Sequence, residues 1–443
     1  MVDVSSDGFE ESSVDQNPYL LPITSQILIK SSNQAITSIA IEKSGARFLV
    51  GGMEGVIRFY DFGGMDARFS SFREITPQVN VAIHSVTQSA KSDLFLVVTN
   101  SVQMKIYERN GTEKVSTKKG DMYIVDFKQT HGHTSTVTSG EFSPISSQSF
   151  VSSSLDGTLR VWDVNSCSRT QTNVIKMCKT ARASVYTAGY QTETSIFGSY
   201  NNCIQTYDLR SSFYSPTLSL TCDENAVEIN SVVFNDYYAF SRSKCDVTLF
   251  DIRTQKRLKS IQSPRRNEFC RMVLSPDRRF LCYSEGDSVV FIESGTLSQI
   301  EEVECSHPND VCWNAVNNQI FVGTEMGDVL VLFDDQLSTK GVMLCKDKVH
   351  ENRKREEEDF WLNHLGKGSD EQTQQRQNEK AHRKQDKKRK KEVIKTDEKA
   401  DYTTQDPRTE LFKYVDKEDL KAVDVKQLQE AHEDVYEVIR KDQ

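Results

Sequence analysis

Short apolar segments of this chain end repeatedly in an aromatic residue that is followed by an acidic one. The clearest copy is Val161-Trp162-Asp163, and in a degenerate copy Ile292 separates Phe291 from Glu293. Successive copies lie 41 to 55 residues apart, and the aromatic residues are Tyr60, Tyr107, Trp162, Tyr207, Phe250, Phe291 and Phe333. This regular spacing constrains the fold more than any other feature of the sequence.

A period of about 40–45 residues is typical of a WD-repeat propeller, in which each blade contains four strands. Seven copies therefore predict an all-β, seven-bladed WD-repeat propeller, which we place at residues 23–346. Its last blade needs a fourth strand to close the ring and remove the free edges. Ser25–Lys30 and residues 341–345 both suit that role, and the sequence leaves the choice open.

The segments on either side of the propeller have a different composition. Residues 1–22 contain five acidic residues and no Lys or Arg, so we expect a disordered acidic arm. Residues 347–443 form a charged tail that we expect to be partly helical. Near its end an amphipathic helix is predicted from the spacing of Leu428, Ala431, Val435, Val438 and Ile439.

Several classes of function find no support in the sequence. The ten cysteines are scattered singly, and no Cys/His cluster has zinc spacing, so we expect neither a metal nor a cofactor. No phosphate-binding loop or exposed nucleophile set occurs, so no catalytic residue is predicted. No apolar segment approaches the length needed to span a bilayer, and we expect no membrane association. The prediction is a protein-interaction scaffold that is not an enzyme.

One blade carries a polar set, His133, Ser152, Asp156 and Trp162. In WD-repeat proteins generally these four side chains form a hydrogen-bonded chain inside the blade, and we expect that structural role here. A Ser-His-Asp set also allows a hydrolase interpretation, but the hydroxyl would be occupied by the indole N–H. Two further residues, Arg58 and Arg160, stand mid-strand and are either part of a recognition surface or solvated.

Some segments are more specific than a generic repeat, namely Gly45-Ala46-Arg47, residues 60–69, and residues 120–126 followed by Gly132-His133-Thr134. Over about residues 21–346 the chain resembles the WD repeat-containing protein seventy family, also called the gastrulation-defective WD-repeat family. Asp406-Pro407-Arg408 is similar to a motif that opens a helix in the family's tail. The resemblance implies a nuclear protein associated with a cullin-type ubiquitin ligase, histone H2B mono-ubiquitination and the DNA-damage response. It also implies a link to spliceosomal complexes.

This resemblance gives two neighbouring repeats a candidate role. They end in Tyr207-Asp208-Leu209-Arg210 and Phe250-Asp251-Ile252-Arg253. In substrate receptors of that ligase, the Arg of such an Asp-x-Arg motif docks on the triple-propeller adaptor. We therefore expect Arg210, Arg253 and Asp251 to dock a partner, although Tyr207 and Phe250 stand where those receptors have Trp.

The tail contains a dense basic run at residues 383–391. Its basic residues, Arg383, Lys384, Lys387, Lys388, Arg389, Lys390 and Lys391, predict a nuclear import signal or a nucleic-acid patch. The expected partners are the ligase adaptor with histone-modifying proteins or, alternatively, splicing proteins, with indirect contact to RNA or chromatin. Arg265-Arg266 and Arg278-Arg279 add basic spots that either contact phosphate or are solvated.

Overall fold

The structure is a computed structural model that describes residues 19–348 except 125, 127–128, 179–182, 223–227, 264–268, 270 and 347. The predictions for the tail beyond residue 348, including the basic run, the amphipathic helix and Asp406-Pro407-Arg408, lie outside the described residues. So do most of the acidic arm and the Arg265-Arg266 pair. No helix among the described residues is long and apolar enough to span a bilayer.

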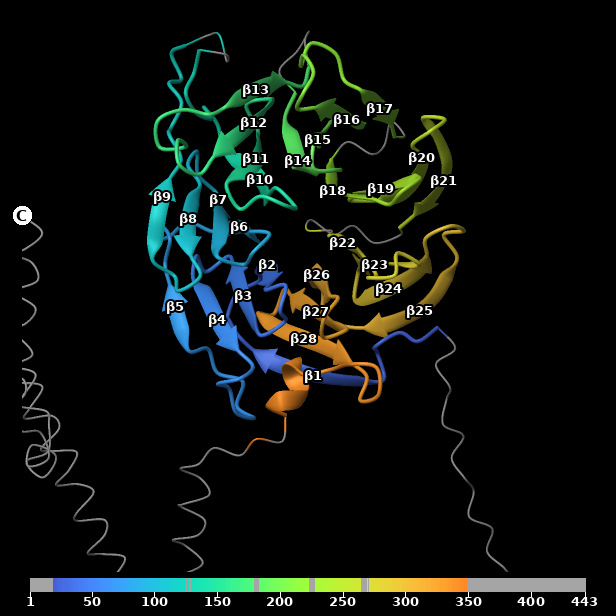
Figure 1. The fold of residues 1–443 in the computed structure, drawn as a ribbon. Helices are drawn as coiled ribbons and strands as arrows, with labels where there is room; N and C mark the ends of the chain where they lie inside the picture. Colours follow the sequence, from blue (N-terminus) through green and yellow to red (C-terminus); the bar gives the residue numbers. More distant parts are fainter. Residues whose placement is uncertain are drawn as a thin grey trace, which may run out of the picture. The chain divides into compact units, whose positions relative to one another are not determined.

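Seven four-stranded antiparallel sheets are arranged around a centre as the blades of a propeller (Figure 1). The described residues contain one short 3₁₀ helix, η1 (Gly341–Leu344), and no α-helix. The predicted all-β, seven-bladed propeller is therefore confirmed.

The strands follow one another outward in each of the first three blades. Blade 1 contains β2 (Ile36–Ile41), β3 (Arg47–Gly52), β4 (Ile57–Asp61) and β5 (Arg73–Ile75). Blade 2 contains β6 (Ile83–Gln88), β7 (Leu94–Thr99), β8 (Lys105–Glu108) and β9 (Glu113–Ser116). Blade 3 contains β10 (Val137–Phe142), β11 (Ser149–Ser154), β12 (Thr158–Asp163) and β13 (Asn173–Lys176).

The next three blades repeat this order. Blade 4 contains β14 (Val185–Tyr190), β15 (Ser195–Tyr200), β16 (Cys203–Asp208) and β17 (Leu218–Thr221). Blade 5 contains β18 (Ile229–Phe234), β19 (Tyr238–Ser243), β20 (Asp246–Asp251) and β21 (Lys256–Gln262). Blade 6 contains β22 (Met272–Leu274), β23 (Phe280–Glu285), β24 (Ser288–Glu293) and β25 (Gln299–Glu304).

Blade 7 is built from both ends of the propeller sequence. It contains β26 (Pro308–Asn314), β27 (Gln319–Thr324) and β28 (Asp328–Phe333), and its outer strand is β1 (Ser25–Lys30). Strand β1 pairs antiparallel with β28, with Ser25 opposite Phe333 and Lys30 opposite Asp328. Of the two candidates, Ser25–Lys30 therefore forms the fourth strand of blade 7, and residues 341–344 form η1 instead of a strand.

The repeated aromatic residues fill the spaces between blades. Tyr60, Tyr107 and Trp162 are buried, and each stands opposite a Phe of the neighbouring strand. The rings of these pairs stack, with centroids 4.6, 5.3 and 6.1 Å apart for Phe48–Tyr60, Phe95–Tyr107 and Phe150–Trp162. Such stacking adds to the free energy gained by burying the rings.

The strand pairing shows that the sequence repeat was misaligned by one residue in blades 6 and 7. Tyr60 stands opposite the second residue of the second strand in its blade. The residues at the equivalent position are Ile292 in blade 6 and Leu332 in blade 7. Phe291 and Phe333 are each one residue away, and because side chains alternate along a strand they face the opposite neighbouring blade. All four side chains are buried, so the aromatic residue still contributes to the core.

Candidate protein-interaction surface and central cavity

The four polar residues of blade 3 form one hydrogen-bonded chain. Trp162 Nε1 donates to Ser152 Oγ at 2.8 Å, and Ser152 Oγ lies 2.7 Å from His133 Nε2. His133 Nδ1 lies 3.0 Å from Asp156 Oδ2. Because the indole can only donate and the carboxylate only accept, a neutral imidazole with its proton on Nδ1 satisfies every group.

The electrostatics agree with that tautomer. Burial lowers the pKa of His133 and outweighs the nearby Asp156 carboxylate. Burial alone would raise the pKa of Asp156, but the hydrogen bonds from His133, Thr158 and the Thr134 backbone lower it. Ser152 is fully buried, so a substrate cannot reach its hydroxyl, and the set acts as an internal brace of the blade.

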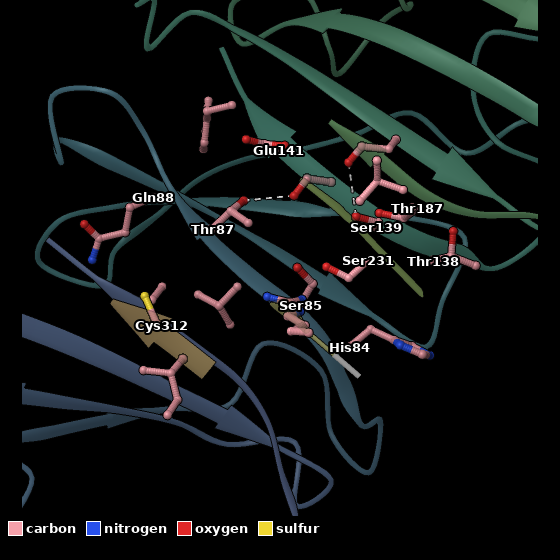
Figure 2. Close-up of a pocket in the computed structure, with 18 of the residues that line it drawn as sticks. His84, Ser85, Thr87, Gln88, Thr138, Ser139, Glu141, Thr187, Ser231 and Cys312 are labelled. Atoms are coloured by element: carbon pink, nitrogen blue, oxygen red, sulfur yellow. Dashed lines mark hydrogen bonds between the residues drawn. The ribbon is translucent and has the colours of Figure 1, made fainter. Parts of the chain in front are cut away.

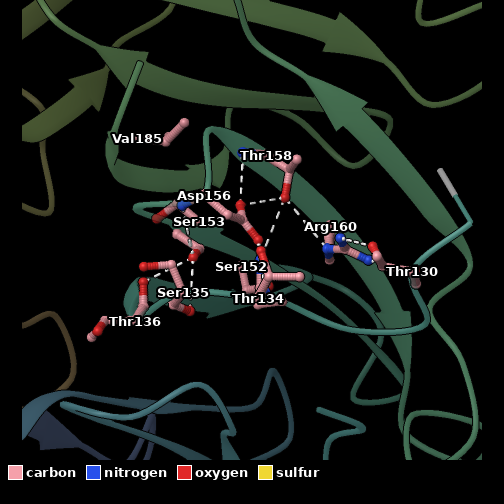
Figure 3. Close-up of polar contacts among 12 residues, drawn as sticks. Thr130, Thr134, Ser135, Thr136, Ser152, Ser153, Asp156, Thr158, Arg160 and Val185 are labelled. Atoms are coloured by element: carbon pink, nitrogen blue, oxygen red, sulfur yellow. Dashed lines mark hydrogen bonds and ion pairs between the residues drawn. The ribbon is translucent and has the colours of Figure 1, made fainter. Parts of the chain in front are cut away.

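Arg160 belongs to the same buried network (Figure 3). Its Nη1 donates to the Thr130 carbonyl at 2.9 Å and its Nη2 to Thr130 Oγ1 at 2.7 Å, while its Nε donates to Thr158 Oγ1 at 3.3 Å. Burial lowers its pKa to about 10. Both interpretations of Arg160, as a recognition residue or a solvated one, are therefore wrong. It anchors the segment that leads into the blade.

The third strand of each of blades 1 to 6 ends with an acidic residue at the same face of the propeller, which we call the aspartate face. It is defined by Asp61, Glu108, Asp163, Asp208, Asp251 and Glu293. The first strand of each blade runs parallel to the third, so the turns that follow both strands lie at this face.

The Asp-x-Arg motifs of blades 4 and 5 build two turns at the aspartate face. Asp208 Oδ1 accepts the backbone N–H of Arg210 at 2.9 Å, and Asp251 Oδ1 accepts that of Arg253 at 2.8 Å. The latter bond is the main reason that the pKa of Asp251 is lowered. Each carboxylate thereby fixes a tight turn and directs the Arg two residues later away from the sheet.

The two Arg side chains then differ. Arg210 makes two bonds with its own Asp208, at 3.2 and 3.0 Å, and 73% of its side chain is exposed. Arg253 instead lies over the ring of Tyr237, 4.6 Å from its centroid, and 55% of Tyr237 is exposed. The structure places both residues on neighbouring blades at one face but gives them separate partners.

The other predicted basic residues are held by carboxylates or rings. Arg58 bonds to Glu54 and Glu74 at 2.7 and 3.0 Å. Arg278 pairs with Asp236, and Arg279 lies over Phe280. These contacts reduce the charge that each residue offers to a partner.

A ring of polar residues around the centre was not predicted. Six first strands carry a bulge at the same position, and the residue after it is polar: Ser38, Ser85, Ser139, Thr187, Ser231 and Asp310. Arg271 takes the equivalent place before β22, as the pairing of blade 6 shows. The sequence signal is a polar residue at one fixed position of each first strand.

Members of this ring bond to the next blade. Ser38 Oγ accepts the Val86 N–H at 3.0 Å, and Ser231 Oγ accepts the Met272 N–H at 3.2 Å. Asp310 Oδ2 accepts the Ile39 N–H at 2.6 Å and lies 3.7 Å from Arg271 Nη1. The ring thus links the inner strands of successive blades.

The junction between blades 7 and 1 has additional bonds of this kind. Three Asn side chains donate from their Nδ2 atoms to carbonyls of blade 1: Asn309 to Ile36 at 3.0 Å, Asn314 to Glu42 at 3.0 Å and Asn317 to Gly45 at 2.7 Å. Together with Asp310, four side chains of blade 7 hold blade 1.

Five of the seven ring residues, Ser85, Ser139, Thr187, Ser231 and Arg271, line a cavity of about 600 Å³. Hydroxyl groups of Thr87, Thr138, Ser139, Thr187 and Ser231 line it, together with His84 and Glu141 (Figure 2). Lys43, Ala90 and Pro144, from turns at the aspartate face, line its end. Among the described residues no group of three or more His, Cys, Asp or Glu is placed to hold a metal ion.

Comparison with known proteins places this architecture among its relatives. Residues 126–163, the blade with the buried polar chain, match the family model "WD domain, G-beta repeat". The chain is 29% identical over 355 residues to the gastrulation defective protein 1 homolog of Drosophila melanogaster, covering 75% of this chain and 54% of that protein. It is 30% identical over 357 residues to WD repeat-containing protein 70 of Bos taurus (76% and 54%).

The predicted resemblance to the WD repeat-containing protein 70 family is confirmed. The human WD repeat-containing protein 70 is 27% identical over 360 residues, which cover 77% of this chain and 55% of that protein. The chain therefore spans about half the length of the curated relatives it matches. WD-repeat propellers are typically scaffolds for protein–protein complexes and are typically not enzymes.

Proposed function

We propose that this protein is a nuclear interaction scaffold that serves as a substrate receptor of a cullin-RING ubiquitin ligase in chromatin and DNA-damage pathways. The supporting observation is the pair of Asp-x-Arg turns at the aspartate face. Among the seven third strands, only those of blades 4 and 5 end in this motif, and in both the Asp accepts the backbone N–H of the Arg. Asp66-Ala67-Arg68 and Asp277-Arg278-Arg279 make the same backbone bond in other turns.

The structure explains how Tyr207 and Phe250 can replace the Trp that precedes the Asp in the ligase receptors. Tyr207 and Phe250 are buried at the position that Trp162 occupies in blade 3. They fill the same space between blades, so the turn that follows can have the same form. An exposed guanidinium offers a planar fork of donors, which suits carboxylate and carbonyl groups of an adaptor.

The test is the double substitution Arg210→Ala and Arg253→Ala in the full chain. Hot-spot residues contribute about 2 kcal/mol or more on truncation, so adaptor binding should weaken by at least about thirtyfold. Arg169→Ala is the matched control, because Arg169 is exposed in the corresponding turn of blade 3. An adaptor that does not bind the wild-type protein refutes the receptor role.

The alternative is a component of a spliceosomal or other RNA-processing assembly. It rests on the basic run at residues 383–391. In that case the double Arg variant keeps its partners, and deletion of residues 351–443 removes them. Co-purification of both variants from nuclear extract separates the two assignments.

A further inference from the structure

The central cavity contains one carboxylate, that of Glu141, which forms no ion pair with a described residue. Glu141 stands on β10, two residues before Ser143 in the turn at the aspartate face. Its carboxylate accepts the backbone N–H of Tyr190 and lies against Gly189, where a side chain would overlap it. No Lys, Arg or His among the described residues forms an ion pair with Glu141.

The other ionisable side chains around the cavity are Arg271, His84 and Lys43. Arg271 lies 3.7 Å from Asp310 and donates to Ser38 Oγ at 3.3 Å. Burial lowers the pKa of His84, which favours the neutral imidazole. Lys43 is exposed at the aspartate-face end. The charge of Arg271 still acts on Glu141 and favours its ionised form, but the Glu141 carboxylate forms no ion pair with a described residue.

The layer of the inner strands that contains Glu141 is otherwise uncharged. The equivalent positions of the other blades are Ala40, Thr87, Gly189, Val233, Val273 and Cys312. Glu141 lies about 7 Å below the turn residue Ser143, since a strand rises about 3.3 Å per residue. A charge at the end of an aliphatic stem can reach this depth, as in Lys and Arg.

We propose that the central cavity binds a Lys or Arg side chain from a basic segment of a partner protein, which enters from the aspartate face and pairs with Glu141. The partner's amino or guanidinium group supplies the donors that the carboxylate lacks, while Thr87 and the hydroxyls of the ring surround its stem. This inference does not depend on the ligase role.

The experiment measures binding of short dye-labelled peptides to the full chain by fluorescence anisotropy. Three alanine-based pentapeptides differ only in their central residue, which is arginine, lysine or the uncharged arginine analogue citrulline. A basic peptide should bind and the citrulline peptide should not. Glu141→Gln should weaken binding by about tenfold or more, because it removes the negative charge that strengthens the hydrogen bond to the bound cation.

Matched variants separate this role from an effect on folding. Glu108→Gln makes the same change at an exposed carboxylate of β8 and should leave peptide affinity unchanged. Glu141→Asp should retain part of the affinity, and Lys43→Met should increase it by removing a competing cation at the entrance. Equal binding of the citrulline peptide, equal affinity of Glu141→Gln, or no binding of either basic peptide overturns the proposal.

Two further variants test whether the bound cation comes from a partner or from this chain, and whether the cavity acts independently of the Asp-x-Arg turns. Replacing the seven basic residues of the run at 383–391 by Gln should leave peptide affinity unchanged. A rise would assign the cavity to the chain's own basic run and refute the partner assignment. Arg210→Ala with Arg253→Ala should also bind the peptide normally, so failure of the ligase proposal and failure of this one are distinguishable.

Discussion

Replacing Asp310 should open the propeller at the junction of blades 7 and 1. The side chain is buried, and its Oδ2 atom accepts the Ile39 N–H at 2.6 Å. Asp310→Ala leaves this buried donor without a partner, which costs about 1–3 kcal/mol. It also removes the counter-charge of Arg271, but that side chain is one-third exposed, so water limits the loss to about 1 kcal/mol or less.

We therefore expect Asp310→Ala to lower the free energy of unfolding by about 1–4 kcal/mol in equilibrium urea denaturation followed by tryptophan fluorescence. Asp310→Asn should cost less, because its amide oxygen still accepts from Ile39 and burial already raises the pKa of Asp310 by disfavouring its charge. Asp335→Ala is the control, since Asp335 is exposed and pairs with Lys346. If Asp310→Ala and Asp335→Ala are equally stable, the ring does not brace the blades.

Three further predictions concern the core, the cavity and the tail. Trp162→Ala should destabilise the protein by about 3–5 kcal/mol, as for other buried aromatic residues, and an unchanged urea midpoint would contradict its core role. Burial raises the pKa of Glu141 from 4.5 to about 7, so the folded state binds more protons and stability should fall as pH rises from about 4.5 to 7. Glu141→Gln should remove that fall, at most about 3 kcal/mol, and an identical pH profile in both proteins would refute the shift. Changing the seven basic residues at 383–391 to Gln should move a fluorescent fusion toward the cytoplasm, and a fusion that stays nuclear would exclude the run as the import signal.

The repeat spacing was enough to predict seven blades because every blade must bury the same position of its third strand. It was not enough to align blades 6 and 7, where Ile292 and Leu332 take the place of an aromatic residue. A shift of one residue is small against a period of about 40, but it reverses the face of the sheet. Only the pairing with the neighbouring strand shows which face each side chain occupies.

The functional residues were likewise predictable where their contacts are local in sequence, and not where they depend on distant residues. The Asp-x-Arg turns depend on bonds between residues two apart, and short-range patterns of this kind are visible in a sequence. Arg160 was misjudged because its partner Thr130 lies 30 residues earlier. The ring and the surroundings of Glu141 depend on contacts between blades, for which the chain shows only one polar residue per first strand.

The distribution of these inter-blade bonds follows from the topology. Blades 1 to 6 are each formed by one continuous segment, so their strands are joined by short turns. Blade 7 joins β28 to β1 across about 300 residues, and closing so long a loop costs conformational entropy that grows with its length. The junction from blade 7 to blade 1 is also where Asn309, Asn314, Asn317 and Asp310 bond to backbone groups. These four side chains stabilise the contact that turns an open array of sheets into a closed ring, and a closed ring is what keeps the aspartate face and the cavity beneath it in a fixed geometry.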